Sequence, residues 1–267
     1  MVLQKKCSYK FGYNSVLDMD EHEEMMLDVG ILNLKKGDSF ECSLELERAF
    51  MLMIGSIYYS WDGKKEKASR FSFLDEKPIV LQVSKGTTVK ITAEEDSEVL
   101  IERCINEKEF ESVFYSRKEV REEVFGNGVL DNTSRRIVRT VFDGELAPFS
   151  NMVMGEVINY PGKWSSYPPH DHPQPEVYYY RFFPKQGFGV SLLEDKATIV
   201  KDGDTSLIFP NNTHSQVAAP GYAMYYVWMI SHLKNNKWLP TTRYYRKEHE
   251  WLNEKNVKIW PQKKFDK

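Results

Sequence analysis

Short apolar and aromatic segments recur at roughly ten-residue intervals along this chain, with turn-forming residues between them. The Asp62-Gly63 pair, which directly follows an aromatic segment, is typical of a two-residue hairpin turn. Regularly spaced short strands of this kind predict an all-β sandwich or barrel. The expected strands cover residues 30–34, 49–54, 56–61, 78–83, 89–93 and 99–103 in the first half, and 137–142, 151–159, 177–183, 189–193, 206–209 and 222–230 in the second.

The length and charge of the chain narrow the classes of protein further. A chain of 267 residues accommodates two domains or one large β domain. A net charge of −3 argues against a nucleic-acid partner, because binding phosphates needs a basic surface. Aromatic residues make up 13% of the chain, which favours strands and a small-molecule pocket.

The sequence shows no sign of membrane insertion or secretion. No run approaches the ~18 consecutive apolar residues of a membrane-spanning helix, so we expect no membrane partner. Residues 1–10 contain no apolar signal region. Three cysteines (Cys7, Cys42 and Cys104) are far apart and form no disulfide framework, as is typical of a reduced cytoplasm. These features predict a cytoplasmic protein.

A change of composition divides the chain. Residues 107–134 are rich in charge and in loop-forming residues, so we place the connection between two domains there. The predicted domains cover residues 1–115 and 116–267. From Lys234 onward the sequence is polar and aromatic without a clear period, and we expect it to pack over the second domain as an arm.

Three histidines and one glutamate carry the strongest chemical signal. His170 and His172 are two residues apart, so in an extended chain their imidazoles point to the same side. Glu176 follows a Pro-Gln-Pro bend, and His214 comes directly after another predicted strand. Three imidazoles and one carboxylate suit one divalent ion of Zn, Mn, Fe or Ni. The absence of a thiolate argues against a closed structural zinc site. Four ligands on a metal that tolerates octahedral coordination leave positions open for substrate oxygens, so we expect a catalytic metal site.

The spacing His-x-His-x₃-Glu, followed by Gly203-Asp204, Pro210 and His214, resembles the two motifs of cupin barrels. Longer strings resemble the 5-deoxy-glucuronate isomerase family of myo-inositol catabolism, between about residues 133 and 230. These strings are KWSSYPPHDH at 163–172, EVYYYRFFPKQGFG at 176–189 and AAPGYAMYY at 218–226.

The resemblance implies an all-β bicupin with two cupin barrels, each a double-stranded β-helix of jelly-roll type. The first domain would be a divergent cupin without metal ligands, and the second would bind the metal. The implied reaction is the aldose–ketose isomerisation of 5-deoxy-D-glucuronate to 2-deoxy-5-keto-D-gluconate through a cis-enediol. No redox cofactor is needed for it, and the sequence contains no nucleotide or flavin fingerprint.

Residues near the metal motif are the candidates for substrate contacts. Alternation along the strand places Tyr178 and Tyr180 on the same side as Glu176, where each hydroxyl could act in catalysis or the ring could simply fill the barrel. A substrate carboxylate would be bound by an arginine or lysine. The candidates for substrate binding are Arg181, Arg139, Arg135, Lys185, Trp164, Phe188 and Gln186, although alternation places Arg181 on the outer face.

Three other functions compete with this interpretation. A sister uronate ketol-isomerase would act on 4-deoxy-5-keto-hexuronates from pectin. A cupin dioxygenase would use the same ligands to hold Fe²⁺ for oxygen chemistry. A sugar-binding cupin without catalysis would have no need for an open metal site. We expect a small-molecule uronate as the partner, and several aromatic strands are compatible with a homo-oligomer.

Overall fold

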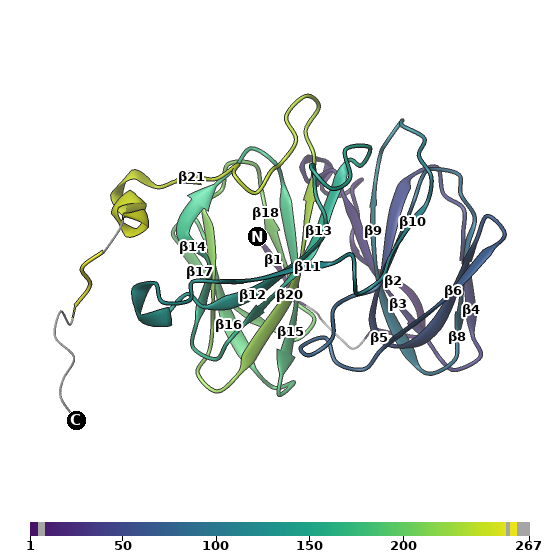
Figure 1. Cartoon of the computed structure of the whole chain (residues 1–267), viewed down its shortest axis with the longest axis horizontal. Coiled ribbons are helices and arrows are strands. Elements are labelled where there is room, and N and C mark those ends of the chain that lie inside the picture. Colours follow the sequence, from purple (N-terminus) through teal and green to yellow (C-terminus); the bar gives the residue numbers. More distant parts are fainter. Residues whose placement is uncertain (5–8, 255–256, 261–267) are drawn as a thin grey trace.

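The computed structural model describes residues 1–4, 9–254 and 257–260. These residues form three sheets and three short 3₁₀ helices (Figure 1). The helices are η1 (Glu23–Met25), η2 (Leu130–Asn132) and η3 (Lys247–Asn253). Within the described ranges, none of the helices has the length and apolar character needed to cross a bilayer.

The first half forms a sheet of nine strands that curls around its own apolar core. The main path runs β10-β7-β5-β9-β3-β2, while β6 and β8 pair with β5 and β4 pairs with β8. The strands are β2 (Gly12–Leu17), β3 (Asp28–Leu34), β4 (Ser39–Cys42), β5 (Glu47–Trp61), β6 (Lys64–Arg70), β7 (Val80–Val83), β8 (Val89–Ala93), β9 (Ser97–Cys104) and β10 (Val113–Tyr115).

Strand β5 corrects one prediction. Residues 49–54 and 56–61 were expected as two strands, but they belong to one strand of 15 residues. Gly55 makes this continuity possible, because it adopts φ +112° and a side chain there would lie 2.7 Å from the Asp96 carbonyl oxygen. The predicted hairpin is present: Trp61 pairs with Lys64 around the Asp62-Gly63 turn.

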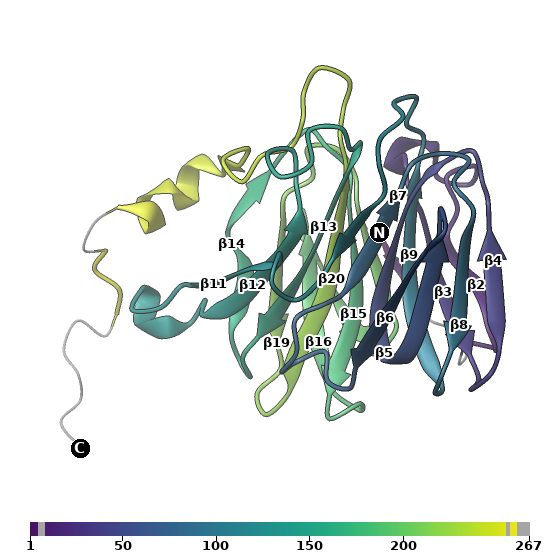
Figure 2. The same cartoon turned by 45° about the vertical axis from the view of Figure 1, so that its right-hand side comes forward.

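The second half forms a barrel from two sheets that enclose a second core (Figure 2). The seven-stranded sheet runs β1-β18-β15-β20-β13-β12-β11 and the five-stranded sheet β17-β16-β19-β14-β21. The strands are β1 (Val2–Leu3), β11 (Arg121–Phe125), β12 (Arg136–Phe142), β13 (Met152–Asn159), β14 (Trp164–Asp171), β15 (Glu176–Phe183), β16 (Phe188–Leu193), β17 (Lys196–Lys201), β18 (Thr205–Ile208), β19 (His214–Ala218), β20 (Ala223–Ser231) and β21 (Tyr244–Tyr245).

The chain changes sheets between β10, which pairs with β7, and β11, which pairs with β12. The domain boundary predicted after residue 115 falls in this stretch, and the two-domain division stays a prediction. Two details of the structure differ from the predicted division. Strand β1 pairs with β18 of the second half, and residues 107–134, expected as a loop-rich connection, contain β10, β11 and η2.

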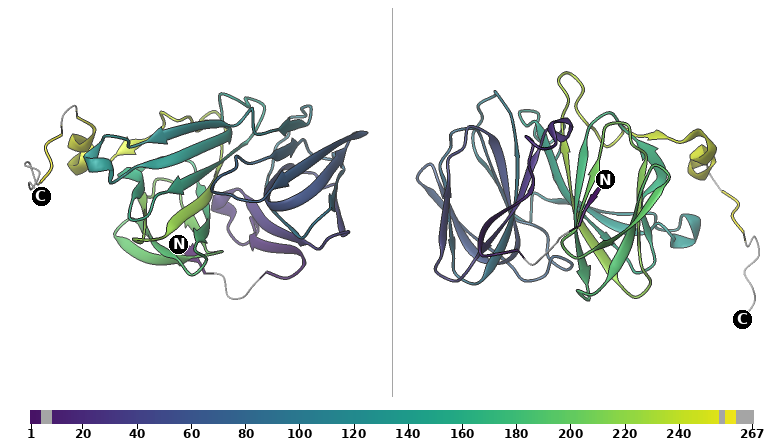
Figure 3. Two further views of the ribbon diagram at one scale, coloured as in Figure 1. Left: turned by 60° about the horizontal axis from the view of Figure 1, so that its bottom comes forward. Right: turned by 180° about the vertical axis from the view of Figure 1, so that it is seen from behind.

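The two halves meet along a shared apolar layer that contains residues of β5 and of β20 (Figure 3). One buried ion network crosses this boundary. Arg70 of β6 donates to both oxygens of Glu156 of β13 at 2.8 Å, and Arg139 of β12 donates to the same carboxylate. Beyond β20, the C-terminal arm runs over the barrel, pairs with β14 through β21 and ends in η3.

Two of the three cysteines lie in described parts of the chain. Cys42 and Cys104 are both buried and free. Cys7 lies outside the described residues.

Candidate active site

The metal motif is assembled where three strands begin or end at one mouth of the second barrel. His170 lies near the end of β14 and pairs with His214, the first residue of β19. His172 follows β14 directly, and the Pro173–Pro175 bend returns the chain to Glu176, the first residue of β15. Ligand atoms of His172, Glu176 and His214 all lie within 4.8 Å of one another, and the three side chains are buried.

The hydrogen bonds of the two histidines decide which nitrogen faces the carboxylate. His172 Nδ1 lies 2.9 Å from the Gln174 carbonyl oxygen, and His214 Nδ1 lies 3.1 Å from that of Asn212. Because a carbonyl only accepts, each Nδ1 carries a proton, and Nε2 is the nitrogen of each ring that faces Glu176. The two Nε2 atoms lie 3.1 and 3.2 Å from Glu176 Oε2, and His214 Nε2 has no hydrogen-bond partner among the described residues.

The Nε2 atoms of two imidazoles and one carboxylate therefore converge in a buried space. Two nitrogens and a carboxylate oxygen in this arrangement form a donor set that a divalent cation can occupy. The carbonyls that hold the Nδ1 protons are the usual outer partners of metal-binding histidines. Burial raises the pKa of the Glu176 carboxyl, but His172 and His214 outweigh burial and bring that pKa below its usual range. The residues present thus fit a metal ion.

His170, the fourth predicted ligand, lies beside this cluster and outside the group that converges within 4.8 Å. Its ring centroid is 4.8 Å from that of His214, and its Nδ1 is 3.0 Å from the Pro168 carbonyl oxygen. Burial, together with His214, lowers the pKa of His170 well below its ordinary value. His170 is therefore neutral and shares the pocket described next.

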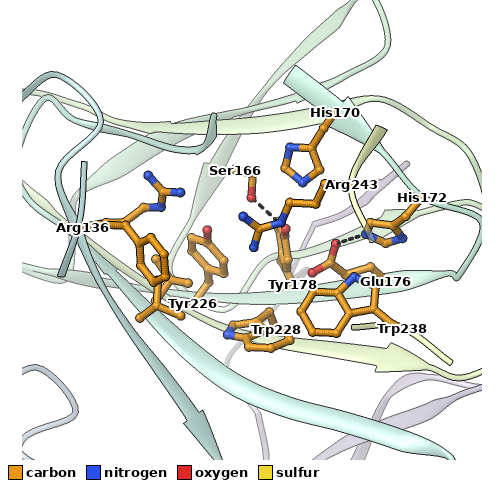
Figure 4. Close-up of a pocket in the computed structure, with 13 residues that line it drawn as sticks. Arg136, Ser166, His170, His172, Glu176, Tyr178, Tyr226, Trp228, Trp238 and Arg243 are labelled. Carbon is orange, nitrogen blue, oxygen red and sulfur yellow. Dashed lines mark hydrogen bonds and ion pairs between the residues drawn. The ribbon is translucent and has the colours of Figure 1, made fainter. Parts of the chain in front are cut away.

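A pocket opens in front of the histidine and glutamate cluster (Figure 4). Aromatic rings form much of its wall, and two arginines, Arg136 and Arg243, face into it. The lining residues are Phe125, Arg136, Val138, Val157, Ser166, His170, His172, Glu176, Tyr178, Tyr226, Trp228, Trp238 and Arg243.

The two predicted catalytic tyrosines have different positions. Tyr178 lines the pocket, and its hydroxyl is 2.9 Å from Ser166 Oγ. Tyr180 lies deeper in the barrel, where its hydroxyl donates to Gln216 Oε1 at 2.6 Å and contacts Ser206. Burial raises the pKa of both phenols, so both stay protonated at neutral pH. Only Tyr178 is placed to donate a hydrogen bond into the pocket.

The structure does not bring the two favoured arginines to the site. Arg139 is bound to Glu122, Glu156 and three backbone carbonyls on the opposite face of β12. Arg181 is paired with Glu98 and Asp202. Since these partners occupy both guanidinium groups, we assign structural roles to Arg139 and Arg181 instead of the predicted contact with substrate.

The remaining candidates for substrate contact also lie outside the pocket. Trp164 packs against Tyr167 with ring centroids 5.4 Å apart. Lys185, Gln186 and Phe188 are exposed in and after the turn that follows β15. Arg135 stacks over the Tyr160 ring at 5.0 Å.

Among the pocket residues that sequence reasoning missed, four carry polar groups: Arg136, Ser166, Trp238 and Arg243. Alternation along β12 could have separated Arg136, which shares its face with Val138 of the pocket, from Arg139 on the other face. Ser166 has φ +49°, in a stretch of β14 where the register with β19 shifts, so it reaches the pocket through an irregularity. Trp238 and Arg243 come from the arm, whose sequence has no period to indicate where it packs.

Comparison with solved structures confirms the expected all-β cupin fold. An IolB-like protein from Salmonella typhimurium superposes with a TM-score of 0.85 at 22% identity, covering 95% of this chain and 99% of that one. The Bacillus subtilis oxalate decarboxylase has a TM-score of 0.63 at 12% identity, with 86% of this chain and 76% of the other covered. Identities this low show the fold alone.

Sequence comparison gives the family. A 5-deoxy-glucuronate isomerase from Geobacillus kaustophilus is 26% identical over 197 residues, which are 65% of this chain and 69% of the relative. Its counterpart from Geobacillus thermodenitrificans is 36% identical over 124 residues, which are 41% of this chain and 43% of the relative. The profile of the KduI/IolB family matches residues 2–252. The chain therefore belongs to the KduI/IolB family.

Proposed function

We propose that this protein is an isomerase that converts 5-deoxy-D-glucuronate to 2-deoxy-5-keto-D-gluconate in myo-inositol catabolism. The observation that carries the proposal is the convergence of His172, Glu176 and His214 beside a pocket that is lined by aromatic rings and two arginines. The family and the named activity of its relatives supply the substrate. We place this activity in the cytoplasm, as the cysteine usage predicts.

His172, Glu176 and His214 would hold one divalent ion, and His170 would complete the set. Nitrogen and oxygen ligands of this kind suit Zn, Mn, Fe or Ni. When bound, the ion would polarise the sugar carbonyl and make the neighbouring C–H more acidic. The carbonyls of Gln174 and Asn212 hold the Nδ1 protons, so Nε2 is the nitrogen of each ring that would bind the ion.

The isomerisation moves one proton from C2 to C1 and one proton from the C2 oxygen to the C1 oxygen. C1 is reduced while C2 is oxidised, so the reaction balances without a nucleotide or flavin. The protonated Tyr178 hydroxyl, held by Ser166, is placed to donate a hydrogen bond to a substrate oxygen. The aromatic wall formed by Tyr226, Trp228 and Trp238 limits the access of water to the reacting carbons.

The test is to follow the conversion of 5-deoxy-D-glucuronate in D₂O by proton NMR, using protein whose metal content has been measured. Appearance of the keto-gluconate with deuterium at C1 supports an enediol route. Failure to convert this sugar while converting a 4-deoxy-5-keto-hexuronate would move the assignment to the sister ketol-isomerase. Consumption of oxygen in place of isomerisation would move it to a dioxygenase.

The metal site is tested separately with His172→Ala. We expect this variant to lose most of the bound metal and its activity, because one of the converging nitrogens is removed. His22→Ala is the matched control, since His22 is distant in sequence and lies outside the pocket lining. Normal metal content in the His172→Ala protein would contradict the proposed site.

A further inference from the structure

Two arginines face the pocket without an acidic partner among the described residues. Arg136 is 7% exposed, and among the described residues its guanidinium donates one hydrogen bond, from Nη1 to the Ser134 carbonyl oxygen at 2.8 Å. Its guanidinium also lies 5.6 Å from the centroid of the Phe125 ring. Arg243, from the arm, points into the same pocket near Tyr178 (Figure 4). No ion pair within the described ranges involves either side chain.

Other buried arginines of this protein are satisfied in a different way. Arg48 donates to four backbone carbonyls, and Arg70 donates to both oxygens of Glu156. A guanidinium has five N–H donors, so Arg136 retains donors that face the pocket. Burying a cation without a counter-charge is costly. Burial lowers the pKa of Arg136, and the nearby charge of Arg243 acts in the same direction.

An anion between the two guanidiniums would remove this cost. Planar guanidinium groups bind carboxylates through pairs of parallel hydrogen bonds. In Figure 4, Arg136 and the Glu176–His172 pair lie at opposite ends of the pocket, with Arg243 between them. A ligand that reached both ends would therefore carry its acidic group away from the histidines.

We propose that Arg136 and Arg243 bind the carboxylate of a sugar acid, while its carbonyl end lies at the His172–Glu176–His214 cluster. This inference rests on the proposed function, which identifies the carbonyl end of the sugar as the end that reacts. It goes further by assigning the two residues that select an acidic sugar over a neutral one. Arg243 gives the arm a part in recognition, because the arm supplies half of this carboxylate site.

The experiment measures binding by calorimetry, so it does not depend on turnover. Metal-loaded protein is titrated with D-glucuronate, with D-glucose as the neutral counterpart and with inorganic phosphate. Arg136→Gln and Arg243→Gln should each weaken D-glucuronate binding by about 10- to 100-fold, the range expected for a lost hydrogen bond to a charged group. Arg135→Gln, which changes the neighbouring arginine on Tyr160, should leave binding unchanged.

The outcomes separate this inference from the proposed function. Equal binding of D-glucuronate and D-glucose by the unchanged protein, or D-glucuronate binding unaffected in both variants, would overturn it. Phosphate binding tighter than that of D-glucuronate, lost in both variants, would overturn the assignment to a carboxylate. If the protein does not isomerise 5-deoxy-D-glucuronate but binds D-glucuronate in an arginine-dependent way, the proposed function is wrong and this inference stands. If Arg136→Gln does not fold, the test uses Arg243→Gln alone, because Arg243 is only half-buried.

Discussion

Replacing Glu102 by Met should stabilise the protein, and by more at higher pH. Glu102 and Glu47 point to the same face of the first sheet, and both are 0% exposed. Glu47 accepts hydrogen bonds from Gln82, Ser150 and Asn106 at 2.6–2.8 Å. In contrast, neither carboxyl oxygen of Glu102 has a hydrogen-bond partner in the parts of the chain that the structure describes. Burial, with a smaller effect of Glu47, raises the pKa of Glu102 well above its usual range.

The direction of the pH effect follows from this raised pKa. The folded protein keeps Glu102 protonated, whereas the unfolded chain releases the proton above about pH 4.3. The unfolded state then binds fewer protons, so the free energy of unfolding falls as pH rises towards the folded pKa, by about 1.4 kcal/mol per pH unit from this group. Met keeps a similar length, removes the unpaired oxygens and does not titrate.

The magnitude has two parts. Removing a buried polar group without a partner should add about 1–3 kcal/mol to the free energy of unfolding even at low pH. Loss of the titration should then make the advantage of Glu102→Met grow between about pH 5 and pH 8. The assay is urea unfolding of the two proteins at pH 5 and pH 8, with Glu47→Gln as the control that should destabilise. A Glu102→Met protein that is less stable at both pH values, or whose advantage is the same at both, would refute the reasoning.

Three further predictions concern the site and its support. Tyr178→Phe should lower turnover by about 10²-fold while metal content stays unchanged. Tyr180→Phe should leave turnover near that of the parent protein, because the Tyr180 hydroxyl lies outside the pocket lining. Equal effects of the two substitutions on turnover would contradict this prediction. Glu156→Gln should lower the free energy of unfolding by about 3–5 kcal/mol, because it leaves two buried guanidiniums without their counter-charge. A much smaller loss, measured by urea unfolding, would contradict this prediction. Gly155→Ala should weaken substrate binding, because the added Cβ would lie 2.5 Å from the Trp228 ring and 2.6 Å from the Arg139 carbonyl oxygen and would therefore displace Trp228 and β12, which both line the pocket. An unchanged KM in the folded variant would contradict this prediction.

Much of the architecture follows from local patterns in the sequence. Alternation along residues 176–183 places Tyr178 inside the barrel and Arg181 outside, as the structure shows. The Asp62-Gly63 turn was predictable because few residue pairs adopt its backbone conformation, with φ of 45° and 74°. Local patterns do not show whether two segments form one strand, so the continuity of β5 through Gly55 depended on its neighbours in the sheet.

The residue types and their order in the sequence indicated His170, His172, Glu176 and His214 as ligands. The structure brings the last three together, whereas His170, which the two-residue interval aligns with His172, lies beside them. The tertiary structure decided which arginines face that cluster. Arg136 and Arg139 are three residues apart on one strand, yet Arg139 faces the first half of the chain whereas Arg136 faces the pocket. Arg243 reaches the pocket from an arm without periodicity. The physical reason is that a strand's alternation is a property of its own backbone, whereas a pocket exists only where the barrel and the arm that packs on it come together.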